Sequence, residues 1–179
     1  IVGIPFAGDI YNFVAAPLIE LLPTDSAMIA KECKRVCDKH GIDYYFKASF
    51  DKANRSSIKG IRGVGMDATL TDFEAIKEQF GVKTITDVHT VEQIQYITEA
   101  YNEVVDALQI PAFLCRQTDL VKAACATDKI VNIKKGQFLH PEDVVNIIKK
   151  IESVGNKNIT ITERGTSFGY RDLVVDPRA

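Results

Sequence analysis

The chain has 179 residues, 46% of them hydrophobic, and its 24 acidic residues nearly balance 22 lysines and arginines, giving a net charge of −2. This length suits one compact domain over residues 1–179, and the charge balance excludes the general basic surface of a nucleic-acid binder. No apolar run approaches the roughly 18 residues that span a bilayer, and no signal-peptide pattern opens the sequence. We therefore expect a cytoplasmic domain with no membrane or nucleic-acid partner.

Short β-branched runs alternate with amphipathic helical stretches along the chain. A helix is predicted over residues 26–40, ending at Gly41, and another opens at Pro141 and ends at Gly155. Six strands are predicted, at residues 13–16, 44–48, 84–87, 107–110, 130–133 and 159–161.

Alternation of strand and helix predicts an α/β fold with a parallel sheet, either an open doubly wound sheet or a closed barrel. Nearly every predicted strand runs into polar or charged residues, as in YYFKASFDKANR and ITITERG. In a (β/α)8 TIM-type barrel these strand ends converge on one face, whereas an open sheet concentrates its site at one switch point. We therefore favour a barrel, with six of its eight βα units in this sequence.

The four cysteines and one glycine-containing run are interpreted as structural features. The four cysteines, at positions 33, 37, 115 and 125, lack the paired spacing of zinc ligands and are expected to be reduced, structural thiols. The run Arg62-Gly63-Val64-Gly65 is no nucleotide-binding fingerprint, and we interpret its glycines as shaping a loop.

Cations recur at the predicted strand ends of this slightly acidic protein: Lys47, Lys52, Arg55, Arg116, Lys134, Lys135 and Arg164. Each alone is more often a solvated surface charge. Their recurrence on separate segments indicates an anion-binding cup, since arginine grips phosphate or carboxylate with two hydrogen bonds and lysine adds a point charge.

Five motifs carry a specific resemblance: KASFDKANRSS from Lys47, TDVH from Thr86, IPAFLCRQTDL from Ile110, NIKKGQF from Asn132 and ERGTSFGY from Glu163. In this order and approximate spacing they resemble the 3-deoxy-D-manno-octulosonate 8-phosphate synthases, a family of phosphoenolpyruvate-dependent sugar-phosphate synthases. The resemblance implies a transferase with a (β/α)8 barrel, usually a homotetramer. The implied reaction condenses phosphoenolpyruvate with arabinose 5-phosphate, giving a lipopolysaccharide precursor and releasing phosphate.

The resemblance also implies roles for individual residues. Lys52, Asp87 and Lys134 match catalytic positions, with Lys52, Lys134, Gln137 and Arg164 forming the phosphoenolpyruvate clamp. Asp87 is also expected among the pentose-phosphate contacts. The other substrate-binding positions are Lys47, Asn54, Arg55, Ser56, Ala112 and Arg116, and Arg116 is similar to an arginine that reaches a neighbouring subunit's site. His89 is either catalytic or a hydrogen-bonded structural residue.

The sequence departs from the family's pattern in two places. Leu18 stands where a cysteine or asparagine belongs, and leucine cannot ligate a metal. The resemblance implies a divalent metal in some members, but other ligands would come from two barrel units beyond Arg178, so we expect no metal ligand here. Six strands would leave open sheet edges, which favours an incomplete sequence over a short functional protein.

Two other functions remain open. A related synthase joins phosphoenolpyruvate to erythrose 4-phosphate in aromatic biosynthesis, and the KANRSS run argues for the five-carbon substrate instead. A truncated or degenerate relative could bind phosphorylated ligands or serve as an assembly partner without catalysis. Leu18 and the missing units favour that alternative, whereas Lys52, Arg55, Lys134 and Arg164 favour an enzyme.

Overall fold

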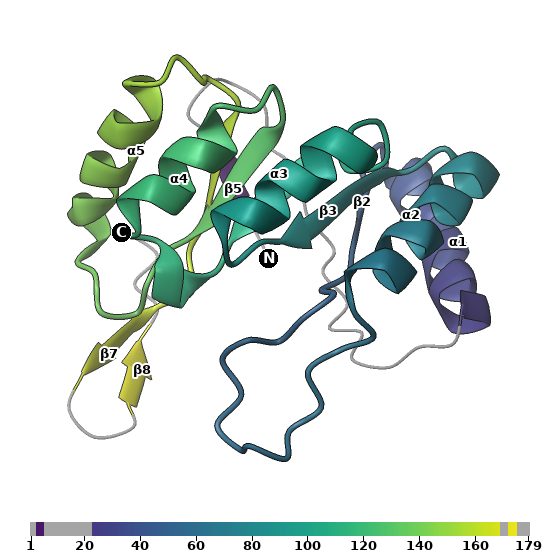
Figure 1. Cartoon of the computed structure of the whole chain (residues 1–179), viewed down its shortest axis with the longest axis horizontal. Helices are drawn as coiled ribbons and strands as arrows, with labels where there is room; N and C mark the ends of the chain where they lie inside the picture. Colours follow the sequence, from purple (N-terminus) through teal and green to yellow (C-terminus); the bar gives the residue numbers. More distant parts are fainter. Residues whose placement is uncertain (1–2, 6–22, 169–171, 175–179) are drawn as a thin grey trace.

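The computed structural model describes residues 3–5, 23–168 and 172–174. Helices and strands alternate from α1 to β6 (Figure 1). The helices are α1 (Pro23–His40), α2 (Met66–Phe80), α3 (Val91–Ala100), α4 (Thr118–Cys125) and α5 (Val144–Glu152), with 3-10 turns at Ala112–Leu114 and Pro141–Asp143. The strands are β1 (Gly3–Pro5), β2 (Tyr45–Lys47), β3 (Lys83–Asp87), β4 (Ala107–Ile110), β5 (Ile130–Lys134), β6 (Ile159–Thr162), β7 (Thr166–Phe168) and β8 (Asp172–Val174).

Five parallel strands, β2 to β6, lie side by side in the order of the sequence. An open doubly wound sheet would reverse direction at a switch point, whereas a barrel adds each strand beside the preceding one. The predicted α/β fold class is therefore confirmed, with the strand order of part of a (β/α)8 barrel.

Each end of the predicted strands agrees with β2 to β6 to within one residue, and β2 is one residue shorter than predicted at both ends. The prediction at residues 13–16 lies outside the described residues. The sheet instead continues into β1, which pairs antiparallel with β6 through Ile4 and Ile161. Of the six predicted barrel strands, five are present as parallel strands among the described residues.

The two faces of the sheet differ in character. Phe46, Leu108 and Ile133 point towards the helices and join one continuous apolar core with residues such as Leu70 and Phe73 of α2. On the opposite face, the described residues form a small apolar cluster of Tyr45, Ile85 and Ala107. Because side chains alternate along a strand, the positions that follow on this second face are Lys47, Asp87 and Gln109. The barrel's inner face therefore becomes polar towards the carboxyl ends of its strands.

The thiols of Cys37, Cys115 and Cys125 are buried and Cys33 is partly buried; all four are free. Burial raises the pKa of the Cys125 thiol to about 12, which keeps it protonated at neutral pH. No helix in the described part of the chain is long and apolar enough to cross a membrane.

Candidate active site

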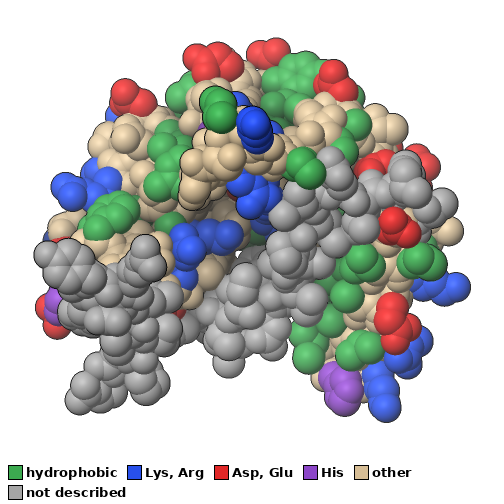
Figure 2. All heavy atoms as spheres, turned by 90° about the horizontal axis from the view of Figure 1, so that it is seen from below, with side chains coloured by type: hydrophobic (Ala, Val, Ile, Leu, Met, Phe, Trp, Pro, Cys, Tyr) green, Lys and Arg blue, Asp and Glu red, His purple; other side chains and the backbone are tan. Residues whose placement is uncertain are grey.

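A cavity of about 350 Å³ opens at the carboxyl ends of the parallel strands. Figure 2 looks onto this end of the molecule and shows Lys and Arg side chains gathered in and around a hollow. The lining residues come from the segments that follow β2, β3, β4, β5 and β6: Ser49, Lys52, Asn54, Asp87, His89, Pro111, Ala112, Phe113, Lys134, Thr162, Glu163 and Arg164.

Six of the predicted site residues line this cavity, namely Lys52, Asn54, Asp87, Ala112, Lys134 and Arg164. Lys47 does not line the cavity but donates a hydrogen bond to Asp87, which does. The other four do not line the cavity either. Arg55 and Ser56 lie exposed on the loop after β2, Gln137 lies partly buried after β5, and Arg116 lines a second cavity with Asp143 and Lys150.

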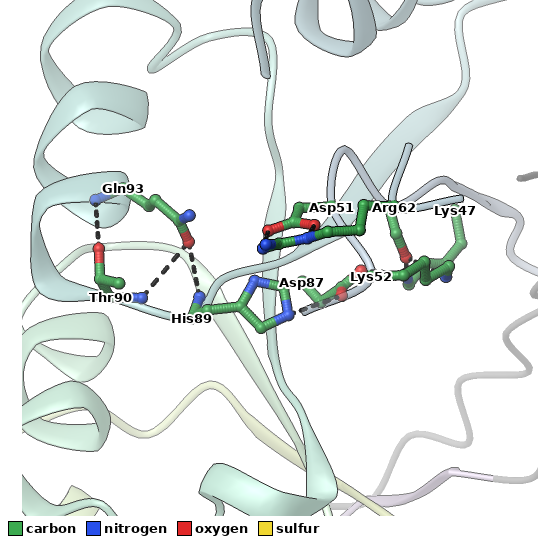
Figure 3. A network of polar contacts seen from close by, with 9 residues as sticks. Lys47, Asp51, Lys52, Arg62, Asp87, His89, Thr90 and Gln93 are labelled. Atoms are coloured by element: carbon green, nitrogen blue, oxygen red, sulfur yellow. Dashed lines mark hydrogen bonds and ion pairs between the residues drawn. The ribbon is translucent and has the colours of Figure 1, made fainter. Parts of the chain in front are cut away.

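Asp87 and Lys47 form a buried ion pair in the centre of the site. The Lys47 ammonium lies 2.5 Å from Asp87 Oδ1 and 2.6 Å from the Ser49 hydroxyl, to which Lys52 also donates at 2.6 Å (Figure 3). Burial alone would raise the pKa of Asp87, but the Lys47 ammonium outweighs it and holds that pKa below its usual value. The carboxylate therefore stays charged and fixes the position of the Lys47 ammonium.

The pKa values of two further ammonium groups in the cavity are lowered. Burial lowers the pKa of Lys134 to about 8, and the positive charge of Lys47 adds to the effect. The pKa of Lys52 is lowered by the same two causes, burial first. An anion that enters the cavity would relieve this repulsion, which is how an anion-binding site gains affinity.

His89 occupies a defined place beside the acid. Its Nε2 lies 3.5 Å from Asp87 Oδ2, and its backbone N–H donates to the Gln93 side chain at 2.7 Å. Gln93 also completes a capping box with Thr90, so the start of α3 fixes the end of β3. Burial lowers the pKa of the imidazole, although Asp87 opposes the shift, and the ring is therefore neutral at pH 7.

The imidazole of His89 lies between two aromatic rings. Phe113 stacks on it at 6.1 Å between centroids, and Phe50 meets it edge-on at 6.2 Å. Its Nδ1 is buried and has no hydrogen-bond partner among the described residues. The structure thus directs Nε2 of the imidazole towards Asp87.

A network of amides and hydroxyls lies beneath the cavity on the inner face of the sheet. The Gln109 amide donates to Asn132 Oδ1 at 2.7 Å, and the Asn132 amide donates to the hydroxyls of Thr160 and Thr162 at 2.8 and 3.0 Å. This network was not among the features predicted from the sequence, although polar residues at alternate positions of buried strands are a signal for it. It gives Thr162, which lines the cavity, a fixed orientation.

Lys135 was predicted to belong to the anion-binding cup, and the structure shows that it does not. Its side chain is 1% exposed, and its ammonium donates to the carbonyls of Gly165, Gly136 and Leu139 at 3.0, 3.3 and 3.3 Å. Successive residues of a strand point to opposite faces, so Lys135 lies behind the site that Lys134 faces. Its charge satisfies backbone carbonyls and joins the segments after β5 and β6.

The described residues contain no group of three or more His, Cys, Asp and Glu side chains that could hold a metal ion. Leu18, the residue that stands at the expected ligand position, lies outside the described residues.

Comparison with known proteins agrees with the five motifs. Residues 23–176 match the model of the DAHP synthetase I family. Proteins named 2-dehydro-3-deoxyphosphooctonate aldolase are similar: that of Geobacter sp. strain M21 is 49% identical over 166 residues, 93% of this chain and 59% of the relative. That of Cyanothece sp. strain PCC 7425 is 51% identical over 172 residues, covering 96% and 62%. That of Fusobacterium nucleatum is 54% identical over 151 residues, covering 84% and 53%.

The chain thus spans a little over half of the length of the curated relatives it matches. The matched region includes the described strands β2 to β6 and every described residue that lines the cavity. This chain therefore belongs to the DAHP synthetase I family.

Proposed function

We propose that this chain carries the main part of an active site that condenses phosphoenolpyruvate with arabinose 5-phosphate. The product is 3-deoxy-D-manno-octulosonate 8-phosphate, a lipopolysaccharide precursor, and phosphate leaves. The observation that carries the proposal is the convergence of Lys52, Lys134 and Arg164 on one cavity from three strand ends, with Lys47 bonded to Asp87 of the same cavity, in a chain of net charge −2. The names of the similar proteins support it.

The cations suit the first substrate, which carries a phosphate and a carboxylate. Lys134 and Arg164 would bind the phosphate of phosphoenolpyruvate, while Lys52 and Gln137 complete the clamp. The methylene carbon attacks the sugar aldehyde, positive charge develops at the enol carbon, and water adds there. Charged groups fixed in a partly desolvated site stabilise such charge movement at little reorganisation cost.

The second substrate would lie towards the loop after β2. Asn54 lines the cavity, and Arg55 and Ser56 follow it on the same loop, so these side chains and Asp87 would bind the pentose phosphate. Holding both anions in attack geometry makes the encounter effectively unimolecular, which contributes roughly 7–11 kcal/mol in favourable cases.

We also propose that the protein works as a homo-oligomer, with four subunits expected. Arg116 is exposed and lies away from the cavity, in the second cavity beside Asp143 and Lys150. The resemblance implies that this arginine reaches the sugar phosphate of a neighbouring subunit, and its exposed position away from the cavity is compatible with that role. Mixing an Arg116→Ala variant with a variant defective at Lys134 should restore part of the activity in mixed oligomers, if the two residues serve one site from different subunits.

We assign no metal ligand to this chain and propose that the protein acts in the cytoplasm. Leucine at position 18 has no lone pair to offer a metal ion. The assignment predicts that calorimetry detects no specific binding of a divalent metal ion to the 179-residue chain. Specific binding of such an ion would overturn it.

The proposed function is tested by measuring phosphate release from phosphoenolpyruvate, with and without arabinose 5-phosphate, and with erythrose 4-phosphate as the alternative acceptor. Release that requires the pentose phosphate supports the proposal. Release only with erythrose 4-phosphate would assign the related synthase reaction instead. Binding of phosphoenolpyruvate by calorimetry without release would indicate a non-catalytic binder, and absence of both would reject the site.

A further inference from the structure

The loop of residues 48–65, between β2 and α2, is held by contacts at its base. Residues 53–59 are all exposed, so the apolar core does not fix their positions. At the base, the Lys52 N–H donates to the Arg62 carbonyl at 2.5 Å, and the Gly65 N–H donates to the Phe50 carbonyl at 3.1 Å. Figure 1 shows this loop extending away from the sheet.

An ion pair closes the loop at the same place. Arg62 Nε lies 2.8 Å from Asp51 Oδ1, and its second nitrogen, Nη2, lies 2.5 Å from Asp51 Oδ2. This is the two-pronged geometry in which arginine binds a carboxylate most strongly. Figure 3 shows the pair in the same view as Lys52, Asp87 and His89.

The two sides of the loop approach so closely that a glycine is needed between them. A Cβ atom on Gly63 would lie 2.5 Å from the Phe50 carbonyl oxygen, and the φ angle of Gly63 is +133°. Phe50 in turn meets the His89 ring edge-on. The closed base of the loop is therefore continuous with the wall of the cavity.

We propose that Asp51 and Arg62 are positioning residues that close the loop so that it presents Asn54 and its neighbours to the pentose phosphate. This inference rests on the proposed function for its substrate. The side chain of Arg62 is 64% exposed, and ion pairs in water contribute little to global stability. The effect of this pair should therefore be local, on the ten-residue excursion that it closes.

The geometry favours positioning over direct binding by Arg62. Two of its guanidinium nitrogens are engaged by Asp51, and Arg62 does not line the cavity. Lys52, by contrast, has a second anchor in the Ser49 hydroxyl. Loss of the ion pair should therefore weaken binding of the pentose phosphate more than binding of phosphoenolpyruvate.

The test compares Arg62→Ala, Asp51→Ala and the exchanged pair Asp51→Arg with Arg62→Asp. We expect each single variant to raise the KM for arabinose 5-phosphate about twofold to fivefold, with kcat changed by less than about twofold, because an exposed ion pair contributes only modestly to the free energy of loop closure. The exchanged pair should recover most of the loss. Unchanged KM values would overturn the proposal. An exchanged pair as impaired as Arg62→Ala would show that Arg62 binds substrate directly, and would overturn it as well.

The chain offers a matched control on α1. Arg35 binds Glu32 with the same two-pronged geometry at 2.8 and 2.6 Å, and both side chains are 63% exposed. Arg35→Ala removes an equivalent ion pair outside the proposed site. It should leave both KM values unchanged, so a change in KM common to both arginine variants would overturn the assignment to the loop.

A second readout requires no substrate. Amide hydrogen exchange at Lys52 and Gly65 should become faster in Arg62→Ala and in Gly63→Ala, and should stay unchanged in Arg35→Ala. If the unmodified protein releases no phosphate, the proposed function fails, while exchange at these amides still decides whether the ion pair closes the loop. Exchange rates equal to those of the unmodified protein in Arg62→Ala would overturn the closure.

Discussion

Two cavities lie at opposite ends of β4 and β5, and they differ in how their lysines are bound. The amino-end cavity, about 480 Å³, is larger than the carboxyl-end cavity of about 350 Å³. Lys129 in the larger cavity donates to the carbonyls of Asn102 and Val105, each at 2.6 Å. In the smaller cavity, the Lys134 ammonium makes no hydrogen bond to any residue that the structure describes. The size of a cavity therefore says less about function than the state of its charges.

An ion pair at the amino end extends the contrast. Lys77 binds both carboxylate oxygens of Asp106, at 2.8 and 2.9 Å, and Asp106 also accepts from the backbone of Thr84. These charges are satisfied within the protein and join α2 to the sheet. At the carboxyl end, Lys47 and Lys52 share one hydroxyl and repel Lys134. Among the described lysines of the two cavities, Lys134 at the carboxyl end is the one that makes no hydrogen bond to a described residue, whereas Lys129 at the amino end is bonded to carbonyls.

The largest expected effect comes from removing the Lys134 ammonium group. Lys134→Met should lower kcat/KM for phosphoenolpyruvate by about 10²–10³-fold, the usual loss for a charge-stabilising group in a desolvated site. It should not lower the thermal midpoint, because the ammonium is partly buried without a hydrogen-bond partner among the described residues. Phosphate-release kinetics and thermal unfolding measure the two effects. Activity within tenfold of the unmodified protein would remove Lys134 from the proposed clamp.

The pH dependence should follow the same lysine. The pKa of Lys134 is lowered to about 8, so the free protein loses this charge as the pH rises through 8. Because the charged form binds the phosphate, kcat/KM should fall about tenfold for each pH unit above that value. Arginine does not lose its charge in this range, so Lys134→Arg should retain activity at high pH better than the unmodified protein. An unchanged profile in Lys134→Arg would assign the titration to another group, such as Lys52.

Much of the fold could be predicted because its signals are local. β-branched runs and helix-ending glycines located β2 to β6 and α1, and the polar strand ends marked the side of the sheet where the candidate site lies. The pairing of β1 with β6 joins residues about 157 apart in sequence, as in Gly3 and Thr162, and no periodicity indicates such a contact. Local patterns predict elements, and distant pairings need the structure.

The site was predictable in its residue types and less so in its contacts. Lys134 and Lys135 have the same chemistry, and only the alternation of a strand separates the cavity side chain from the structural one. That alternation was present in the sequence and could have corrected the count of cations. The Asp51–Arg62 pair closes a loop of irregular backbone, where no repeat relates the two residues.

The smallest effect on activity is expected at the amino end. Lys129→Met leaves the Asn102 and Val105 carbonyls without their buried donor, which should lower the free energy of unfolding by about 1–3 kcal/mol. Phosphate release per folded molecule should stay within about twofold, because this end of the sheet faces away from the proposed chemistry. Urea unfolding and single-turnover phosphate release separate the two quantities. If the folded variant instead lost activity as Lys134→Met does, the hydrogen-bonded Lys129 would be as important to the reaction as Lys134. The hydrogen bonding of the lysines in a cavity could then no longer identify the functional cavity.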